Sequence, residues 1–126
     1  MHQVILSLGA NYEAEKNLPE ARKSLGQILF SPIYTDAIWT EPIASKRTDL
    51  YLNQLVKAQT NLEFDALIKA IKEIEIRHGR TPEEREKDIV RIDIDVLEYD
   101  GVRHHLRDWE RPYVRQLLAR NYSVPS

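Results

Sequence analysis

The 126-residue chain alternates strand-forming and helix-forming patterns in a fixed order: strand, helix, strand, strand, helix, strand. The clearest helical pattern covers 64–78, where apolar residues recur at i, i+3, i+4 and i+7, and Gly79 follows in the place of a C-terminal cap. The clearest strand covers 92–99, which begins with apolar residues alternating with acidic ones. Each pattern has an apolar face, so the elements must pack against one another.

Further strands are predicted from runs that are rich in β-branched, aromatic and other apolar residues. These runs are 4–8, which is apolar on both faces and is expected to be central, 29–40, 50–60 and, after the hairpin signal Asp100-Gly101, 102–106. The second run contains Pro32, which is tolerated near the start of a strand.

The other segments are predicted from capping residues and charge. Asn17 is expected to cap a helix whose apolar stripe runs from Leu18 to Ile28. The charged stretch 81–88 has no apolar face, so we predict a mobile loop there. A last short helix is expected over 112–118.

The order of these elements matches the split βαβ, or ferredoxin-like, arrangement, in which both main helices pack on one face of an antiparallel sheet. We therefore predict an α+β sandwich. Neither a repeat nor a linker divides the sequence, so residues 1–126 are expected to form a single domain.

Composition narrows the functional classes. Lys and Arg total 18 and Asp and Glu total 20, so the formal net charge of −2 gives no electrostatic case for a general nucleic-acid binder. The absence of cysteine excludes disulfides, thiolate metal sites and cysteine nucleophiles. No apolar run approaches the roughly 18 residues of a membrane span, and the N-terminal run is too short for a signal peptide. A soluble protein of the cytoplasm is expected.

Asp93 and Asp95 are the strongest chemical signal in the sequence. Alternation along the strand puts both carboxylates on the face opposite Ile92, Ile94 and Val96, with Cα atoms roughly 6.6 Å apart. Two adjacent carboxylates repel each other unless a positive group lies between them, and a divalent metal such as Mg²⁺ is one answer. The alternative is a solvated strand edge whose acids pair with a neighbouring arginine, either Arg91 or Arg103.

Glu75 is the second unusual acid, because it falls on the apolar stripe of the helix over 64–78. A carboxylate in that position needs a partner, and we expect Arg80 or a group of the functional site to supply it.

Six groups of residues, taken in order, resemble the 6-hydroxymethyl-7,8-dihydropterin pyrophosphokinases over roughly 4–118. These groups are Ser7-Leu8-Gly9-Ala10-Asn11, Tyr34 with Thr40-Glu41-Pro42-Ile43, Tyr51-Leu52-Asn53, Ile74-Glu75 with His78-Gly79-Arg80, Ile92-Asp93-Ile94-Asp95-Val96-Leu97, and His105 with Arg111-Pro112-Tyr113-Val114. The ferredoxin-like fold of that family agrees with the element order predicted above.

The resemblance implies an enzyme that transfers pyrophosphate from ATP to the pterin hydroxymethyl group, releasing AMP, in folate biosynthesis. Asp93 and Asp95 would then hold two Mg²⁺ ions and, with Arg80, act in catalysis. ATP would contact Arg80, His105 and Arg111. The implied pterin residues are Thr40, Pro42, Ile43, Tyr51, Asn53 and Tyr113, which offer aromatic faces for a flat ring and an amide for its edge.

The sequence departs from the family in one loop. Where the family usually has Arg-Trp-Gly-Pro-Arg, this chain has Glu86-Lys87-Asp88-Ile89-Val90, and Arg85, Lys87 and Arg91 are the candidate replacements. Losing a phosphoryl-transfer arginine can cost about 10³-fold in rate, so weak activity is one expectation. The alternatives are a non-catalytic pterin- or nucleotide-binding module of the same fold and a structural or regulatory domain.

Overall fold

The computed structural model describes residues 1–42 and 47–121. It contains a six-stranded antiparallel sheet in the order β2-β4-β1-β5-β6, with β3 also paired to β4. The strands are β1 His2–Ala10, β2 Phe30–Tyr34, β3 Ile38–Thr40, β4 Tyr51–Thr60, β5 Asp93–Tyr99 and β6 Val102–Arg103. The helices are α1 Ala14–Leu25, α2 Phe64–Arg77, α3 Pro82–Glu86, α4 Leu106–Trp109 and α5 Pro112–Asn121.

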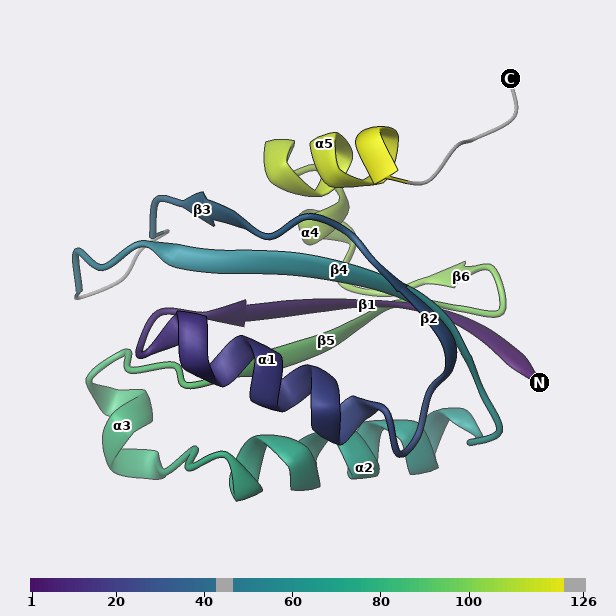
Figure 1. Cartoon of the computed structure of the whole chain (residues 1–126), viewed down its shortest axis with the longest axis horizontal. Coiled ribbons are helices and arrows are strands. Elements are labelled where there is room, and N and C mark those ends of the chain that lie inside the picture. The colour runs from purple at the N-terminus through teal and green to yellow at the C-terminus, as the bar shows by residue number, and fades with distance from the viewer. Residues whose placement is uncertain (43–46, 122–126) are drawn as a thin grey trace.

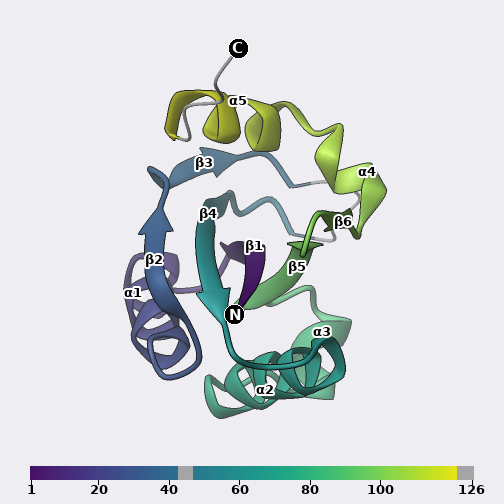
Figure 2. The same cartoon turned by 90° about the vertical axis from the view of Figure 1, so that its right-hand side faces the viewer.

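Helices cover both faces of the sheet. Helices α1 and α2 lie together on one face, and α5 lies on the other (Figures 1 and 2). The ferredoxin-like α+β arrangement predicted from the element order is therefore confirmed, as is the central position of β1 between β4 and β5.

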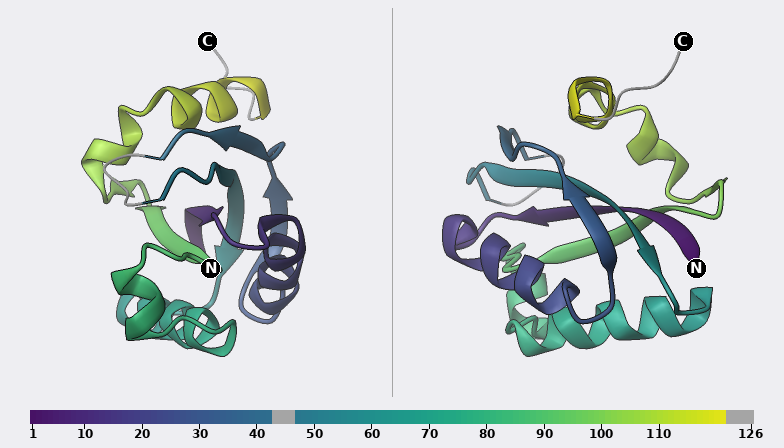
Figure 3. Two further views of the ribbon diagram at one scale, coloured as in Figure 1. Left: turned by 90° about the vertical axis from the view of Figure 1, so that its left-hand side faces the viewer. Right: turned by 45° about the vertical axis from the view of Figure 1, so that its right-hand side comes forward.

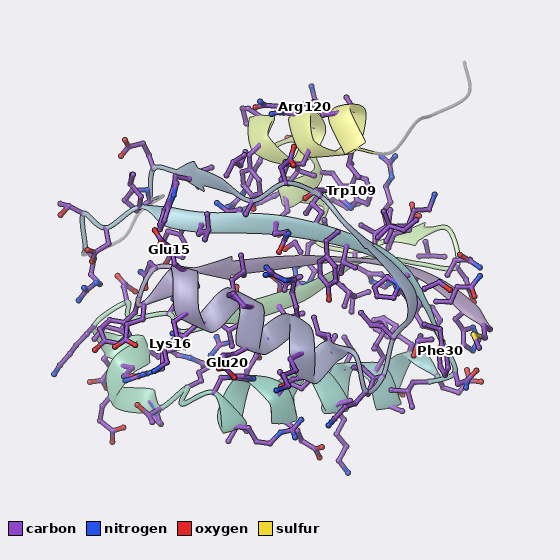
Figure 4. All side chains as sticks on the ribbon, viewed as in Figure 1. Glu15, Lys16, Glu20, Phe30, Trp109 and Arg120 are labelled. Atoms are coloured by element: carbon purple, nitrogen blue, oxygen red, sulfur yellow. The ribbon has the colours of Figure 1, made fainter. Side chains whose placement is uncertain are left out.

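Each face carries its own apolar cluster. The larger cluster joins α1 and α2 to the sheet through residues such as Leu6, Leu18 and Ile71. The smaller one joins α5 to the opposite face through Leu55 and Leu117. Trp109, which Figure 4 labels, is partly buried and packs against this smaller cluster. These two clusters explain why β1 is apolar on both faces.

The prediction of one strand over 29–40 is wrong, because the segment forms β2 and β3 with a break between them. At the break Thr35 is buried and its hydroxyl oxygen accepts a hydrogen bond from Leu55 N at 2.9 Å. Within β2, Ser31 adopts φ +51° beside Pro32, and the register with β4 shifts there. The kinked chain follows local hydrogen bonds rather than one continuous ladder.

Asn17 does not cap the first helix. Helix α1 begins three residues earlier, after Glu13, and Ala14 already lies in the core. Asn17 is buried inside the helix, where its Nδ2 donates to the Tyr12 carbonyl oxygen at 2.8 Å. The apolar stripe extends toward the N-terminus far enough to form another turn, and this burial outweighs the capping preference of Asn.

The mobile loop predicted over 81–88 is also wrong, since most of it forms α3. The Thr81 hydroxyl caps this helix by accepting from Glu84 N at 3.2 Å, and Pro82 occupies the first turn. The predicted hairpin return over 102–106 is only partly correct, because β6 ends at Arg103. The predicted last helix is present as α5 and is longer than expected.

Within the described ranges, none of the helices combines the length and apolar character that crossing a bilayer requires.

Candidate active site

Two cavities meet at Asp93 and Asp95, which line both. The first cavity, of about 670 Å³, lies on the α5 side of the sheet, and the second, of about 910 Å³, lies beside α2 and α3. Strand alternation accounts for their place in the first cavity, because Ile94 and Val96 are buried against the α1–α2 layer and the two carboxylates lie on the opposite face.

The sheet register places a row of site residues across three neighbouring strands. Gly9 on β1 is paired with Asn53 on β4 and with Asp93 on β5. Two residues earlier on β1, Ser7 is paired with Asp95. Gly9 has no side chain to fill the space between its neighbours. A Cβ atom at that position would lie 3.2 Å from Asn53 Oδ1, closer than ordinary packing allows. The glycine therefore leaves room between the amide and the carboxylate.

Glu75 and Arg80 fix the outer edge of β5. The Glu75 side chain is 8% exposed, and its Oε2 accepts from Ile94 N at 2.8 Å and from Arg80 Nη1 at 2.9 Å. The same Arg80 nitrogen reaches Asp93 Oδ1 at 3.1 Å. The sequence analysis expected Arg80 or a group of the functional site as the partner of Glu75, and the structure shows Arg80 in that role. The alternative pairing of Asp93 or Asp95 with Arg91 or Arg103 is not observed among the described residues, because Arg91 contacts Glu84 and Arg103 contacts Glu98.

Two carboxyl groups of the site, those of Asp95 and Glu75, have raised pKa values. Burial, together with the charge of Asp93, raises the pKa of Asp95 to about 6, although His105 and Arg80 oppose this rise. Burial also raises the pKa of Glu75 to about 7 against the stabilising effects of Ile94 N–H and Arg80. His105 Nε2 lies 3.8 Å from Asp95 Oδ1. The carboxylate pair is therefore only partly neutralised by the protein.

The first cavity gathers most of the residues predicted to contact a pterin: Thr40, Tyr51, Asn53 and Tyr113. Asn53 Nδ2 donates to the Thr40 hydroxyl at 2.6 Å. Burial raises the pKa of the Tyr51 and Tyr113 hydroxyls, so both stay neutral. Pro42 is half-buried but does not line this cavity, and Ile43 lies outside the described residues.

The three residues predicted to contact ATP are separated. Arg80 and His105 line the second cavity, whereas Arg111 lines the first, where its Nε forms an ion pair with Asp108 Oδ1 at 3.0 Å. The second cavity also has an apolar wall, formed by Ile68, Ile71, Ile76 and Val96.

Sequence reasoning missed several residues that line the first cavity. Four were quoted in the family motifs but given no role in the site: Ser7, Gly9, Glu41 and Pro112. The other four are Ile38, Trp39, Asp108 and Gln116. Two of them carried a usable signal: Gln116 follows Tyr113 by three residues on one helix, and Asp108 precedes Arg111 by three. No sequence signal placed Trp39 in the cavity, because its position depends on the break between β2 and β3.

Together, the fold and the site define a ferredoxin-like α+β domain in which two adjoining cavities share one pair of carboxylates. The sequence matches the model of the 7,8-dihydro-6-hydroxymethylpterin-pyrophosphokinase (HPPK) family over residues 5–122, and the chain belongs to this family. A comparison with curated proteins found no match. Family membership supports, in general terms, an ATP-dependent pyrophosphokinase of folate biosynthesis that uses Mg²⁺.

The residues present fit the magnesium that the family implies. In the described parts of the chain no group of three or more His, Cys, Asp and Glu side chains converges as a metal site. Mg²⁺ does not need such a group, because it is usually bound through one or two carboxylates together with water and substrate phosphates. The adjacent carboxylates of Asp93 and Asp95, which the protein leaves partly uncompensated, match that requirement.

Proposed function

We propose that this protein transfers pyrophosphate from ATP to the hydroxymethyl group of 6-hydroxymethyl-7,8-dihydropterin and releases AMP. The observation that carries the proposal is the shared carboxylate pair: Asp93 and Asp95 lie where the two cavities meet. We assign one cavity to each substrate. The cytoplasmic location remains a prediction from the sequence.

The first cavity suits the pterin. Tyr51 and Tyr113 provide aromatic faces for a flat ring, and the Asn53 amide oxygen offers an acceptor for the ring's edge. Because Gly9 leaves the space between Asn53 and Asp93 open, a ring held at Asn53 can direct its hydroxymethyl group toward the carboxylates.

The second cavity suits ATP. Its apolar wall, which includes Ile71 and Ile76, can cover a purine base, while Arg80 and His105 lie on the side of the carboxylates. With the base against this wall, the polyphosphate would lie between the base and the pterin hydroxyl.

The reaction then needs alignment and charge neutralisation more than covalent chemistry. The pterin hydroxyl oxygen attacks the β-phosphorus and loses its proton, and the bond from that phosphorus to the oxygen of the α-phosphate breaks, which releases AMP. Asp93 and Asp95 would hold Mg²⁺, which neutralises phosphate charge when bound. Arg80 holds Asp93 in position through the ion pair described above.

A second candidate is a pterin- or nucleotide-binding module that transfers nothing. The observation in its favour is the segment 86–90, which lacks the two arginines of the family loop.

The decisive assay measures AMP release from ATP and Mg²⁺ with and without the pterin. We expect pterin-dependent release, and we expect Asp95→Ala to lower it by about 10³-fold or more because the metal site loses half of its protein ligands. Glu98→Gln, on the same strand but lining neither cavity, is the matched control and should retain full activity. Pterin binding without AMP release would establish the binding module instead.

A further inference from the structure

Residues 81–91, which include the loop that departs from the family, are attached to the rest of the protein by hydrogen bonds. Val90 O accepts from Asn11 N at 2.9 Å and from Tyr12 N at 3.2 Å, and Val90 N donates to Asn11 Oδ1 at 2.6 Å. Asn11 Nδ2 also donates to Asp88 O at 2.7 Å. Helix α3 is thereby held beside the start of β5 (Figures 1 and 3).

Arg91 contributes to this attachment and is not directed at either cavity. Its Nε donates to Glu84 at 2.7 and 2.9 Å, and its guanidinium carbon lies 4.7 Å from the centre of the Tyr12 ring. Gly79, with φ +100°, makes room for it, because a Cβ atom there would lie 2.9 Å from Arg91 Cδ. Arg91 therefore does not replace the missing loop arginines.

Arg85 has the opposite surroundings. It projects from α3 as part of the lining of the second cavity, together with Arg80, His105, Asp93 and Asp95. Arg80 is engaged by Glu75 and Asp93, and His105 faces Asp95. Within residues 1–42 and 47–121, the Arg85 guanidinium has neither an ion-pair nor a hydrogen-bond partner, so its donors are available to a ligand.

We propose that Arg85, presented by the fixed helix α3, contacts the β- and γ-phosphates of ATP in the second cavity. The inference rests on the proposed function and adds a residue that the resemblance did not assign to ATP. A guanidinium matches phosphate oxygens through paired donors, and a helix already fixed in place delivers it without a closing movement.

The test compares the affinities of three proteins by calorimetry: the unchanged chain, Arg85→Ala and Lys87→Ala. Lys87 is also a candidate replacement from the sequence, but it is exposed at the C-terminal end of the same helix and lines neither cavity. It is therefore a matched control for charge. The ligands are α,β-methylene-ATP with Mg²⁺, whose Pα–Pβ link cannot be cleaved, and AMP, which lacks the β- and γ-phosphates. We expect Arg85→Ala to weaken binding of the ATP analogue about tenfold, the loss of one charge-assisted contact. AMP affinity in Arg85→Ala and all affinities in Lys87→Ala should change less than about twofold.

An unchanged affinity of Arg85→Ala for the ATP analogue would overturn the proposal, and so would an equal loss for AMP, which would place the effect on the base or the fold. Pterin-dependent AMP release by the unchanged chain is measured in parallel. A chain that binds the analogue but releases no AMP refutes transfer and leaves Arg85 to be judged by the affinities. A chain that binds no analogue overturns both proposals.

Discussion

The two cavities beside Asp93 and Asp95 are built from different kinds of structure. The first takes most of its lining from β1, β3, β4 and β5, where the pairing register fixes the position of each side chain. The second takes most of its lining from α2, α3 and β5, and the attachments of α3 include its cap, Asn11 and the Glu84–Arg91 pair. The comparison shows where the sequence departs from the family: Thr40, Tyr51 and Asn53, which match pterin positions of the family, stand on strands, whereas the departure falls at the end of a short helix.

Glu75 supports the start of β5, where the two cavities meet, so its removal should lower the stability of the fold. Glu75→Ala leaves the Ile94 N–H without its acceptor and Arg80 without one of its two partners, so we expect a loss of about 2 kcal/mol in the free energy of unfolding. Urea denaturation measures this loss. Glu75→Gln, which retains an acceptor for Ile94 N–H, should lose less. Equal stability of Glu75→Ala and the unchanged chain would refute the supporting role.

A substitution at Asn53 should weaken ligand binding in the first cavity and leave binding in the second cavity nearly unchanged. Asn53→Ala removes the amide from the first cavity alone, so pterin affinity should fall about tenfold while the affinity for α,β-methylene-ATP changes less than about twofold. Calorimetric titration with each ligand provides the comparison. A similar loss for both ligands would mean that the cavities are not independent and would remove Asn53 from pterin recognition.

A substitution at Val90 should alter the function of neither cavity. Val90→Arg restores an arginine that the family loop carries, but both backbone groups of Val90 are bonded to the Asn11 region, so the new side chain has no closing loop to carry it. We expect turnover in the AMP assay to remain within about twofold of the unchanged chain. A clear gain would show that the segment moves during the reaction.

The same contrast explains what could be predicted from the sequence. Alternation placed Asp93 and Asp95 on one face, and the burial of a carboxylate pointed from Glu75 to Arg80, because both arguments depend on local period and charge. The choice between Arg85 and Arg91 could not be made that way, since it depends on Glu84 and Tyr12, which contact Arg91 only in the folded chain. Thr81 followed by Pro82 is a sequence signal for the start of a helix, and α3 begins there. The prediction of a loop relied instead on the high charge of the segment.

The hydrogen bond from Ile94 N to Glu75 also bears on self-association. A strand edge with unpaired N–H groups can pair with a strand of another molecule, and here a carboxylate already occupies the outward-facing N–H of Ile94. At the opposite edge of the sheet, Pro32 has no N–H to offer, and the positive φ of Ser31 interrupts the extended line of β2. Both edges are thereby poor templates for the strand-by-strand growth that leads to aggregation.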